Sequence, residues 1–520
     1  MRIGVDVGGT NTDAALLSGR QVLGSVKRPT TGDVSTGISS AIAALIEDCG
    51  VSADRIDAVM IGTTHFTNAF VQRRELVPVY AIRLGFPAGR GIPPFSAWPD
   101  DLKNAVCGGR TMVAGGFEFD GSEIGALDEA AVVKAVEEAK EMGLTQIAVS
   151  CIFSQLNATH EQRAAELIAD IDPKLEVSLS SELGRVGLLE RENAAIMNAS
   201  LRPLAKQITA AFNKALTDLN ITAQFFISQN DGTLMSADHM QRYPVLTFAA
   251  GPTNSLRGAA WLTGASDAIV VDIGGTTSDI GVLVSNFPRQ SSVHVDVGGV
   301  RTNFRMPDVL SIGLGGGSIV RELDDRITIG PDSVGYKLHS EGLIFGGKTL
   351  TTSDIAVASG QAEFGDRARV AELSQDVVEG AQAAILNMLE EAIDRMKTAS
   401  GDVPMILVGG GSVLVGEKPR GVSEMLKPEH AGVANAIGAA IGQVSGEVDR
   451  IYAITDDESR KCALLDAETQ AIEQAVSAGA DRSSIETVNI EAVPLQYLPG
   501  GATRVVCRVV GDLAMGGGDR

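Results

Sequence analysis

Short continuous apolar runs alternate along the chain with longer stretches in which apolar residues recur three and four positions apart. "QIAVSCIF" and "PMILVGGGSVL" are examples of the first kind, and "LDEAAVVKAVEEAKEMG" is an example of the second. Such a pattern predicts buried strands separated by amphipathic helices. Because strands and helices alternate through most of the sequence, we predict the α/β fold class.

The helical spacing predicts several long helices, each ended by a glycine or a change of pattern. Pro203 predicts a kink or break in one of them. The charges at Arg185, Glu190, Arg191 and Glu192 are most simply a helix surface, although an arginine here could meet substrate. Gly438 and Gly442, four positions apart, predict close packing of the last helix against another helix. The predicted helical ranges are 34–50, 127–143, 188–219, 374–401 and 429–446.

Two distant stretches repeat one unusual pattern: "RIGVDVGGTNTDAAL" at 2–16 and "AIVVDIGGTTSDIGVL" at 268–283. Each consists of an apolar strand, Asp, one residue, Gly-Gly-Thr, and then Thr or Ser with a second Asp. Paired glycines permit a tight turn whose backbone N–H groups can point at phosphate oxygens. One copy alone would equally suit an ordinary β-hairpin, but two matching copies favour a pair of phosphate-binding loops.

The acidic residues of these loops are the candidates for metal binding and catalysis. Asp6 and Asp272 end their strands and are predicted to bind Mg²⁺, mostly through water, because Mg²⁺ keeps much of its hydration shell. Asp13 and Asp279 follow seven positions later and are candidates for holding a water molecule or transferring a proton. Thr10 is a third catalytic candidate. The predicted nucleotide-binding residues of the two loops are Gly8, Gly9, Thr10, Asn11, Thr12, Gly274, Gly275, Thr276 and Thr277.

A third glycine-rich loop follows the buried strand in "ILVGGGSVL". Gly409, Gly410 and Gly411 would let the backbone lie flat against a nucleotide base or ribose. A glycine cluster after a strand is common, so this signal gains its weight from coming after the two phosphate loops.

Composition and charge narrow the range of partners. The chain has 520 residues, which predicts more than one domain, and a net charge of −22 at pH 7. That charge argues against nucleic-acid binding, so a nucleotide would have to be held by backbone N–H groups and a metal ion. The five cysteines are widely spaced and suggest neither disulfides nor zinc. With no membrane-length apolar run and a strand at the very start, we expect a cytoplasmic protein without membrane contact.

The order of first phosphate loop, connecting helix, second phosphate loop, adenosine loop and second connecting helix resembles the superfamily of actin, sugar kinases and heat-shock ATPase domains. More narrowly, the chain resembles the hydantoinase A/oxoprolinase family over roughly residues 1–450. The narrower resemblance rests on "DVGGTNTDAAL", "IGTTHFTNAFVQRR", "VSCIFSQLNATHEQRAAELI", "FFISQNDGTLMS", "YPVLTFAAGPTNSLRGAAWLTG", "DIGGTTSDIGVL" and "LSIGLGGGSIV".

This resemblance implies two actin-like ATPase domains of ribonuclease H-like type around a nucleotide cleft, with inserted subdomains. The expected division is 1–80 for the first phosphate-loop part, 81–245 for an inserted α/β subdomain, 246–450 for the second domain, and 451–520 for a small α+β segment. The chain is shorter than the usual family member, and the resemblance implies that it lacks most of the family's C-terminal domain. Its "AAGPTNSLRGA" also has Thr253, Asn254 and Ser255 where small residues are expected, so the substrate stays open.

The implied activity is ATP- and Mg²⁺-dependent opening of a cyclic amide, such as a hydantoin, oxoproline or a lactam, through phosphorylation of the amide oxygen. The family's large subunit often works with a second hydantoinase-type subunit, and self-association is equally open. Alternatives are a subunit of an ATP-dependent carboxylase and a regulatory or activating ATPase whose output is closure. An actin-like filament protein is disfavoured by the family stretches.

Three other features of the sequence each allow two interpretations of their role. His65 could contact substrate or metal, or could be a structural residue at a helix start. His294 and Asp296 could form a metal pair, although a solvated strand face is the simpler explanation. The turn at 313–318, "GLGGGS", could bind an anion near the cleft or act as a hinge.

Overall fold

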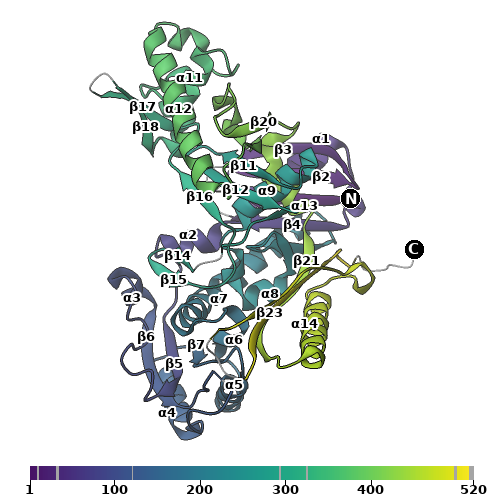
Figure 1. Ribbon diagram of the computed structural model, residues 1–520. Coiled ribbons are helices and arrows are strands. Elements are labelled where there is room, and N and C mark those ends of the chain that lie inside the picture. Colours follow the sequence, from purple (N-terminus) through teal and green to yellow (C-terminus); the bar gives the residue numbers. More distant parts are fainter. Residues whose placement is uncertain are drawn as a thin grey trace.

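The computed structural model describes residues 1–8, 11–30, 34–119, 121–291, 294–323, 326–496 and 500–514. Its largest sheet crosses the middle of the molecule (Figure 1) in the order β22-β23-β21-β10-β9-β4-β1-β2-β3. The strands are β1 (Arg2–Val7), β2 (Asn11–Ser18), β3 (Gln21–Pro29), β4 (Ala58–Thr63), β9 (Gln224–Ser228), β10 (Thr233–Ser236), β21 (Gln443–Ala453), β22 (Glu486–Pro494) and β23 (Ala502–Gly511).

A second sheet lies in the upper lobe of Figure 1, in the order β13-β12-β11-β19-β20, with β16 paired to β12. It repeats the local plan of the first sheet, because β11 pairs antiparallel with β12 and parallel with β19, as β1 does with β2 and β4. Its strands are β11 (Ala268–Ile273), β12 (Ser278–Val284), β13 (Phe287–Pro288), β16 (Val309–Ile312), β19 (Val403–Val408) and β20 (Val422–Leu426).

A third, parallel sheet stands at the opposite end of the molecule in the order β6-β5-β7-β8 (Figure 1). Two separate two-stranded ribbons complete the described strands. The bounds are β5 (Val79–Phe86), β6 (Cys107–Ala114), β7 (Gln146–Cys151), β8 (Glu176–Leu179), β14 (Val295–Val297), β15 (Val300–Thr302), β17 (Ser318–Leu323) and β18 (Arg326–Ser333).

The helices cover these sheets, and the longest, α7, packs its buried face against α1 and against β7, β8 and β5 of the third sheet. No helix within the described ranges combines the length and apolar character that crossing a membrane requires. The helices are α1 (Val34–Cys49), α2 (His65–Val71), α3 (Asp100–Val106), α4 (Glu129–Glu141), α5 (Thr159–Ile171), α6 (Ser180–Leu183), α7 (Leu188–Asp218), α8 (Ala237–Arg242), α9 (Ala250–Thr263), α10 (Leu338–Glu341), α11 (Thr352–Ala358), α12 (Gln375–Met396), α13 (Ala434–Ala440) and α14 (Asp457–Ser477).

Helices α9 and α13 cross in close contact between the two repeated sheets (Figure 1). A Cβ atom on Gly258 would lie 1.9 Å from the carbonyl oxygen of Ala434, and one on Gly438 would lie 1.8 Å from that of Asn254. A Cβ on Gly4 of β1 would lie 1.9 Å from the Ala436 oxygen. Because only glycine allows such an approach, Gly258 and Gly438 let α9 and α13 cross at close range, and Gly4 seats α13 directly on β1. The predicted close packing at Gly438 is confirmed.

The predicted helix at 429–446 is wrong over its second half. Helix α13 ends at Ala440, and from Gln443 the chain forms strand β21. Val444, Gly446 and Val448 are buried while Ser445 and Glu447 are not, and this alternation is the period of a strand. A Cβ on Gly446 would lie 1.9 Å from the carbonyl oxygen of Ala471, so this glycine serves the packing of α14 on the strand.

The interpretation of the charges in α7 as a helix surface is also wrong. Arg191 and Glu192 are buried, and Arg83 of β5 donates from Nε to Glu192 Oε2 at 2.7 Å. Ser150 donates to the same carboxylate at 2.7 Å. A buried charge pair of this kind requires a partner on another element, which the local sequence of α7 does not reveal.

Candidate functional site

The first repeated stretch forms the β1–β2 hairpin. Gly8 N donates to Asn11 O at 3.0 Å and closes the turn, and the strands place Asp6 directly opposite Asp13. Both aspartates are almost completely buried, as is Thr12. The predicted site residues Gly9 and Thr10 lie outside the described residues. The hairpin therefore holds two carboxylates side by side next to its turn.

The second repeated stretch forms the β11–β12 hairpin in the same way. Gly274 N donates to Thr277 O at 2.9 Å, and Asp272 stands opposite Asp279. Here the turn residues Gly275, Thr276 and Thr277 are exposed, and both aspartates are partly exposed. The hydroxyls and N–H groups of this turn are thus accessible to a ligand.

The two aspartate pairs lie close enough to influence each other electrostatically. Burial raises the pKa of Asp6 to about 7, the carboxylate of Asp13 adds to the rise, and Asp272 contributes further, while the Asn435 amide opposes it. Burial likewise raises the pKa of Asp272 to about 6, against the hydroxyl of Ser255, with Asp279 and Asp13 contributing to the rise. Carboxylates whose charges repel one another in a buried place favour a cation beside them.

Side chains from the crossing helices and from β3 reach this group. Asn435 of α13 donates from Nδ2 to Asp6 Oδ2 at 2.9 Å and to Asp13 Oδ2 at 3.1 Å. Lys27 Nζ donates to Asp13 Oδ2 at 2.9 Å. Asn254 of α9 lies next to Asp6, since a Cβ on Gly62 would be 2.5 Å from both Asn254 Nδ2 and Asp6 Oδ1.

Sequence reasoning did not assign these supporting residues to the site. The departure at 253–255 from the family pattern was a usable signal, because Asn254 and Ser255 are the α9 residues beside the two strand-ending aspartates. Asn435 sits in a run of small apolar residues and Lys27 on an outer strand, so neither carries a comparable signal.

The site fits a divalent cation held chiefly by two carboxylates. The Oδ1 atoms of Asp6 and Asp13, and both side-chain polar atoms of Asn254, are buried without a hydrogen-bond partner. Buried polar atoms normally have partners, so these mark a place for an additional group. Within the described part of the chain no cluster of three or more His, Cys, Asp or Glu forms a metal site. A Mg²⁺ ion held here would therefore need water and phosphate oxygens as its remaining ligands.

The three-glycine turn after β19 lies against the second hairpin. Gly409 has a φ of +85°, and a Cβ there would stand 2.2 Å from Asp272 Oδ1. A Cβ on Gly411 would meet Ile273 Cγ2 at 2.5 Å, whereas Gly410 is exposed with open space beside it. Because its glycines have no side chains, this turn can lie directly beside Asp272.

The turn at 313–318 supports the second hairpin from behind. Gly316 N donates to Gly274 O at 3.0 Å, and Gly317 N donates to Gly275 O at 2.7 Å. These two N–H groups are therefore engaged by protein carbonyls. The turn acts on the exposed loop indirectly, by holding its backbone in place.

The histidine candidates lie in different surroundings. His65 begins α2, with its Nδ1 2.6 Å from Thr63 Oγ1, and burial lowers its pKa. His294 lies on the surface with its Nδ1 2.7 Å from an Arg301 nitrogen. Asp296 accepts from Gly299 N at 2.8 Å. His294 and Asp296 therefore both have local partners within the β14–β15 ribbon.

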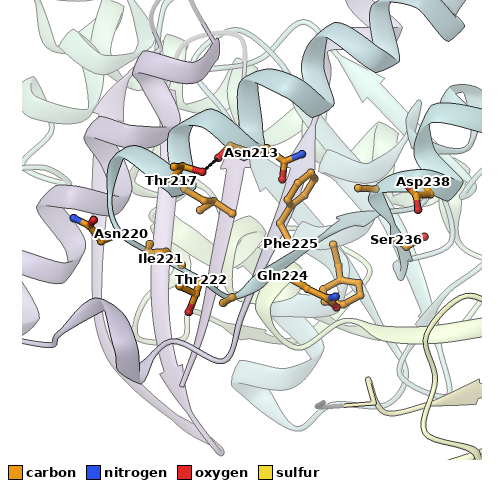
Figure 2. A pocket seen from close by; sticks show the side chains of 13 residues that line it. Asn213, Thr217, Asn220, Ile221, Thr222, Gln224, Phe225, Ser236 and Asp238 are labelled. Carbon is orange, nitrogen blue, oxygen red and sulfur yellow. Dashed lines mark hydrogen bonds between the residues drawn. The ribbon is translucent and has the colours of Figure 1, made fainter. Parts of the chain in front are cut away.

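Two surface hollows lie away from the aspartates. One, of about 710 Å³, opens between the end of α7, β9 and α8 (Figure 2) and has mostly uncharged walls. The other, of about 810 Å³, lies at the far end of β1, beside Arg2. Neither is lined by an aspartate of the hairpins.

Comparison with known proteins agrees with this architecture. Residues 2–172 match the hydantoinase/oxoprolinase N-terminal region, and residues 191–365 match hydantoinase/oxoprolinase. The acetophenone carboxylase gamma subunit of Aromatoleum aromaticum is 27% identical over 395 residues, 69% of this chain and 53% of that protein. The caprolactamase subunit alpha of Pseudomonas jessenii is 27% identical over 389 residues, 69% of this chain and 54% of that protein.

The crystal structure of the ATP-dependent caprolactamase from Pseudomonas jessenii covers 98% of this chain with 87% of its own, at a TM-score of 0.79 and 21% identity. Two sheets that each begin with an aspartate-paired hairpin, joined by crossing helices, make this a protein of the actin-like ATPase fold, as predicted. The two matched family regions together cover more than half of the chain, which belongs to the hydantoinase/oxoprolinase family. It spans about half the length of the acetophenone carboxylase gamma subunit and of the caprolactamase subunit alpha.

Proposed function

We propose that this chain binds Mg²⁺-ATP at the two hairpins and uses it to open a cyclic amide. The observation that carries the proposal is that two matching hairpins each hold two aspartates opposite each other, Asp6 with Asp13 and Asp272 with Asp279. In the first pair, the Oδ1 atoms are buried without a hydrogen-bond partner. Such a group is costly without a cation. The relatives described as ATP-dependent support the choice of nucleotide.

In this proposal Asp6 and Asp272 hold the metal ion from opposite sides. The exposed turn of Gly275, Thr276 and Thr277 binds phosphate oxygens through its N–H and hydroxyl groups. From the first hairpin, Asn11 is proposed to bind phosphate oxygens together with Gly9 and Thr10. The N–H of Gly8 is engaged by Asn11 O and Thr12 is buried beside Thr30, so these two residues shape the turn instead. The turn of Gly409, Gly410 and Gly411 receives the adenosine, because its open face borders Asp272.

When bound, Mg²⁺-ATP would supply the phosphoryl group that, placed on the amide oxygen, makes the amide carbon a better electrophile for water, so that the C–N bond can break. The chain would contribute position and charge stabilisation, which dominate phosphoryl transfer. Asp279, accepting a hydrogen bond from Ser311, and Asp13, held by Lys27, are placed to orient a water molecule or accept a proton. Their raised pKa values make both carboxylates stronger bases than free aspartate.

A second subunit is part of the proposal. The acetophenone carboxylase gamma subunit and the caprolactamase subunit alpha are both named as subunits, and the chain matches only about half of each. The proposed division of labour places ATP use on this chain and completion of ring opening on a partner.

A second candidate is an ATP-dependent carboxylase subunit. It rests on the acetophenone carboxylase gamma subunit, which matches this chain at the same identity and over the same share of it as the caprolactamase subunit does. The same hairpins would then activate an enolate oxygen.

The test is ATP turnover by the purified chain, alone and with a candidate partner subunit, against panels of lactams and hydantoins and of ketones with bicarbonate. Turnover stimulated by a cyclic amide and lost in Asp272→Asn supports the first candidate, and stimulation by ketones supports the second. Substrate-independent turnover would instead support a regulatory ATPase. Absence of Mg²⁺-ATP binding would contradict all three.

A further inference from the structure

The hollow beside Arg2 lies at the opposite end of the first hairpin from its aspartates. Arg2 and Asp6 are four residues apart on β1, or roughly 13 Å at the rise of a strand. The walls of the hollow come from the far ends of β1 and β2, the last two turns of α9 and the end of α13. The lining residues used below are Arg2, Arg20, Arg257, Trp261, Ile441 and Gln443.

Three arginines line this hollow in a protein whose net charge is −22. Among the residues that the structure describes, none of Arg2, Arg20 and Arg257 has an ion-pair partner. The two acidic residues in the wall are already engaged, because Asp57 pairs with the amino group of Met1 and Asp512 accepts from Gln443 Nε2 at 3.4 Å.

Arg257 is the strongest indication of a missing anion. Its side chain is 93% removed from solvent, and its guanidinium lies over the ring of Phe287 at 4.2 Å. Burial and the nearby positive charge of Arg508 lower the pKa of Arg257 to about 10. A buried guanidinium normally has a carboxylate or phosphate partner.

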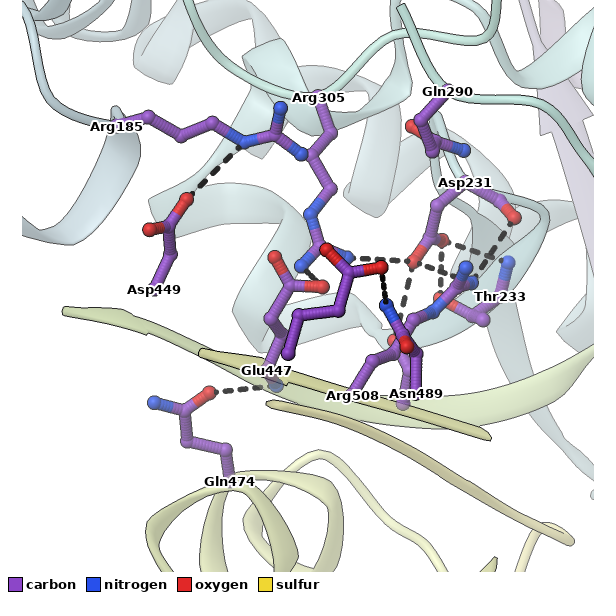
Figure 3. Close-up of polar contacts among 12 residues, drawn as sticks. Arg185, Asp231, Thr233, Gln290, Arg305, Glu447, Asp449, Gln474, Asn489 and Arg508 are labelled. Atoms are coloured by element: carbon purple, nitrogen blue, oxygen red, sulfur yellow. Dashed lines mark hydrogen bonds and ion pairs between the residues drawn. The ribbon is translucent and has the colours of Figure 1, made fainter. Parts of the chain in front are cut away.

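The nearest acid is committed elsewhere. Asp231 accepts from Arg508 Nη2 at 3.0 Å and from Thr233, and it lies 3.6 Å from Arg305 (Figure 3). Arg305 is also paired with Glu447. Asp231 is therefore shared by Arg508 and Arg305, and Arg257, which lines the hollow, has no carboxylate of its own.

From these observations we infer that the hollow binds a small organic anion, through Arg257, Arg20 and Arg2 for its charged group and Trp261 with Ile441 for an apolar body. A volume of about 810 Å³ is within the usual size of small-molecule sites. Carboxylates and phosphates share the geometry that arginine recognises, so either group fits. The site is separate from the proposed nucleotide site, although α9 contacts both through Asn254 and Trp261.

Binding can be followed by the fluorescence of Trp261, since the other tryptophan, Trp98, is buried and hydrogen-bonded to Asn193. The probes are benzoate and phenyl phosphate, with benzamide as the uncharged control, and Trp261→Phe should remove the signal. We expect a saturable change with at least one anion and none with benzamide. Benzoate alone or phenyl phosphate alone would identify the charged group as a carboxylate or a phosphate.

Two variants test the assigned residues. Arg20→Gln, at an exposed position, should weaken binding about ten-fold, and Arg257→Met should weaken it further without lowering the melting temperature, because an unpaired buried charge is removed. Arg460→Gln, on the exposed face of α14, should leave binding unchanged.

Asp272→Asn separates this site from the nucleotide site. We expect Asp272→Asn to bind each anion with the same affinity as the parent protein does. The inference is overturned if neither anion binds, if benzamide binds equally, or if Arg460→Gln weakens binding as much as Arg20→Gln does. Loss of phenyl phosphate binding in Asp272→Asn but not in Arg257→Met would also overturn it.

Discussion

The two hairpins are nearly the same in sequence, yet the protein holds them in different ways. In the first, the aspartates are buried and fixed from the side by Asn435 and Lys27. In the second, the aspartates are partly exposed and the turn is held from behind by Gly316 and Gly317. Side chains bond the carboxylates of both hairpins, Ser255 and Ser311 doing so in the second, but within the described residues only the second hairpin has its turn backbone fixed by glycine N–H groups while the turn residues stay exposed.

This difference predicts separate consequences for the two strand-ending aspartates. Asp6→Asn and Asp272→Asn should each lower Mg²⁺-dependent ATP turnover by about 100-fold or more, since each removes a proposed metal ligand. Because the folded-state pKa of Asp6 lies above its unfolded value, its ionised form at pH 8 opposes folding. Asp6→Asn should therefore raise the stability of the metal-free protein by on the order of 2 kcal/mol.

Steady-state ATPase assays and urea unfolding measure both effects, with the exposed Asp296→Asn as a matched control that should change neither. A loss of stability in Asp6→Asn, or unchanged turnover in Asp272→Asn, would contradict the assigned roles.

The support behind the second hairpin can be broken separately. Gly315→Ala would place a Cβ 2.5 Å from Thr276 N, so the exposed turn must shift. We expect turnover to fall about ten-fold or more, with a loss of stability of about 1–3 kcal/mol. Gly401→Ala is the matched control, because the space beside Gly401 is open and this glycine lies outside the proposed site. Equal effects of the two changes on nucleotide affinity, measured by calorimetry, would show that the contact behind the turn is unimportant.

The support beside the first hairpin should respond more moderately. Asn435→Ala removes the amide that donates to both Asp6 and Asp13, and should lower turnover about ten-fold with a stability loss of about 1–2 kcal/mol. Ser255→Ala is the corresponding change at Asp272 and should have a smaller effect, because Asp272 is partly hydrated. If Ser255→Ala proves the more damaging change in ATPase assays, the contrast between the hairpins is wrong.

The smallest effect is expected at Lys27. Its ion pair with Asp13 is half exposed on the lysine side, so Lys27→Met should cost at most about 1 kcal/mol of stability. Loss of the positive charge should raise the pKa of Asp13 and lower turnover a few-fold. Arg28→Met, at the exposed neighbouring position, provides the baseline in thermal melting and ATPase assays. Indistinguishable behaviour of the two variants would show that Lys27 does not support Asp13.

The sequence by itself determined the repeated hairpins, the α/β class and the family. These follow from local signals, namely apolar runs that end in Asp-x-Gly-Gly-Thr, and they need no knowledge of distant contacts. It also indicated the close packing at Gly438. The roles assigned to the hairpin residues stay predictions, and the experiments above test them.

Tertiary structure decided which residues surround those hairpins. Asn435 reaches Asp6 and Asp13 from more than 400 positions away, and Gly316 and Gly317 hold a turn some 40 positions earlier. Tertiary pairing also made a strand of residues 443–453 and buried Arg191 and Glu192 within a helix. Local patterns record the period of an element and the shape of a turn, whereas burial and charge pairing depend on what the rest of the chain places beside it.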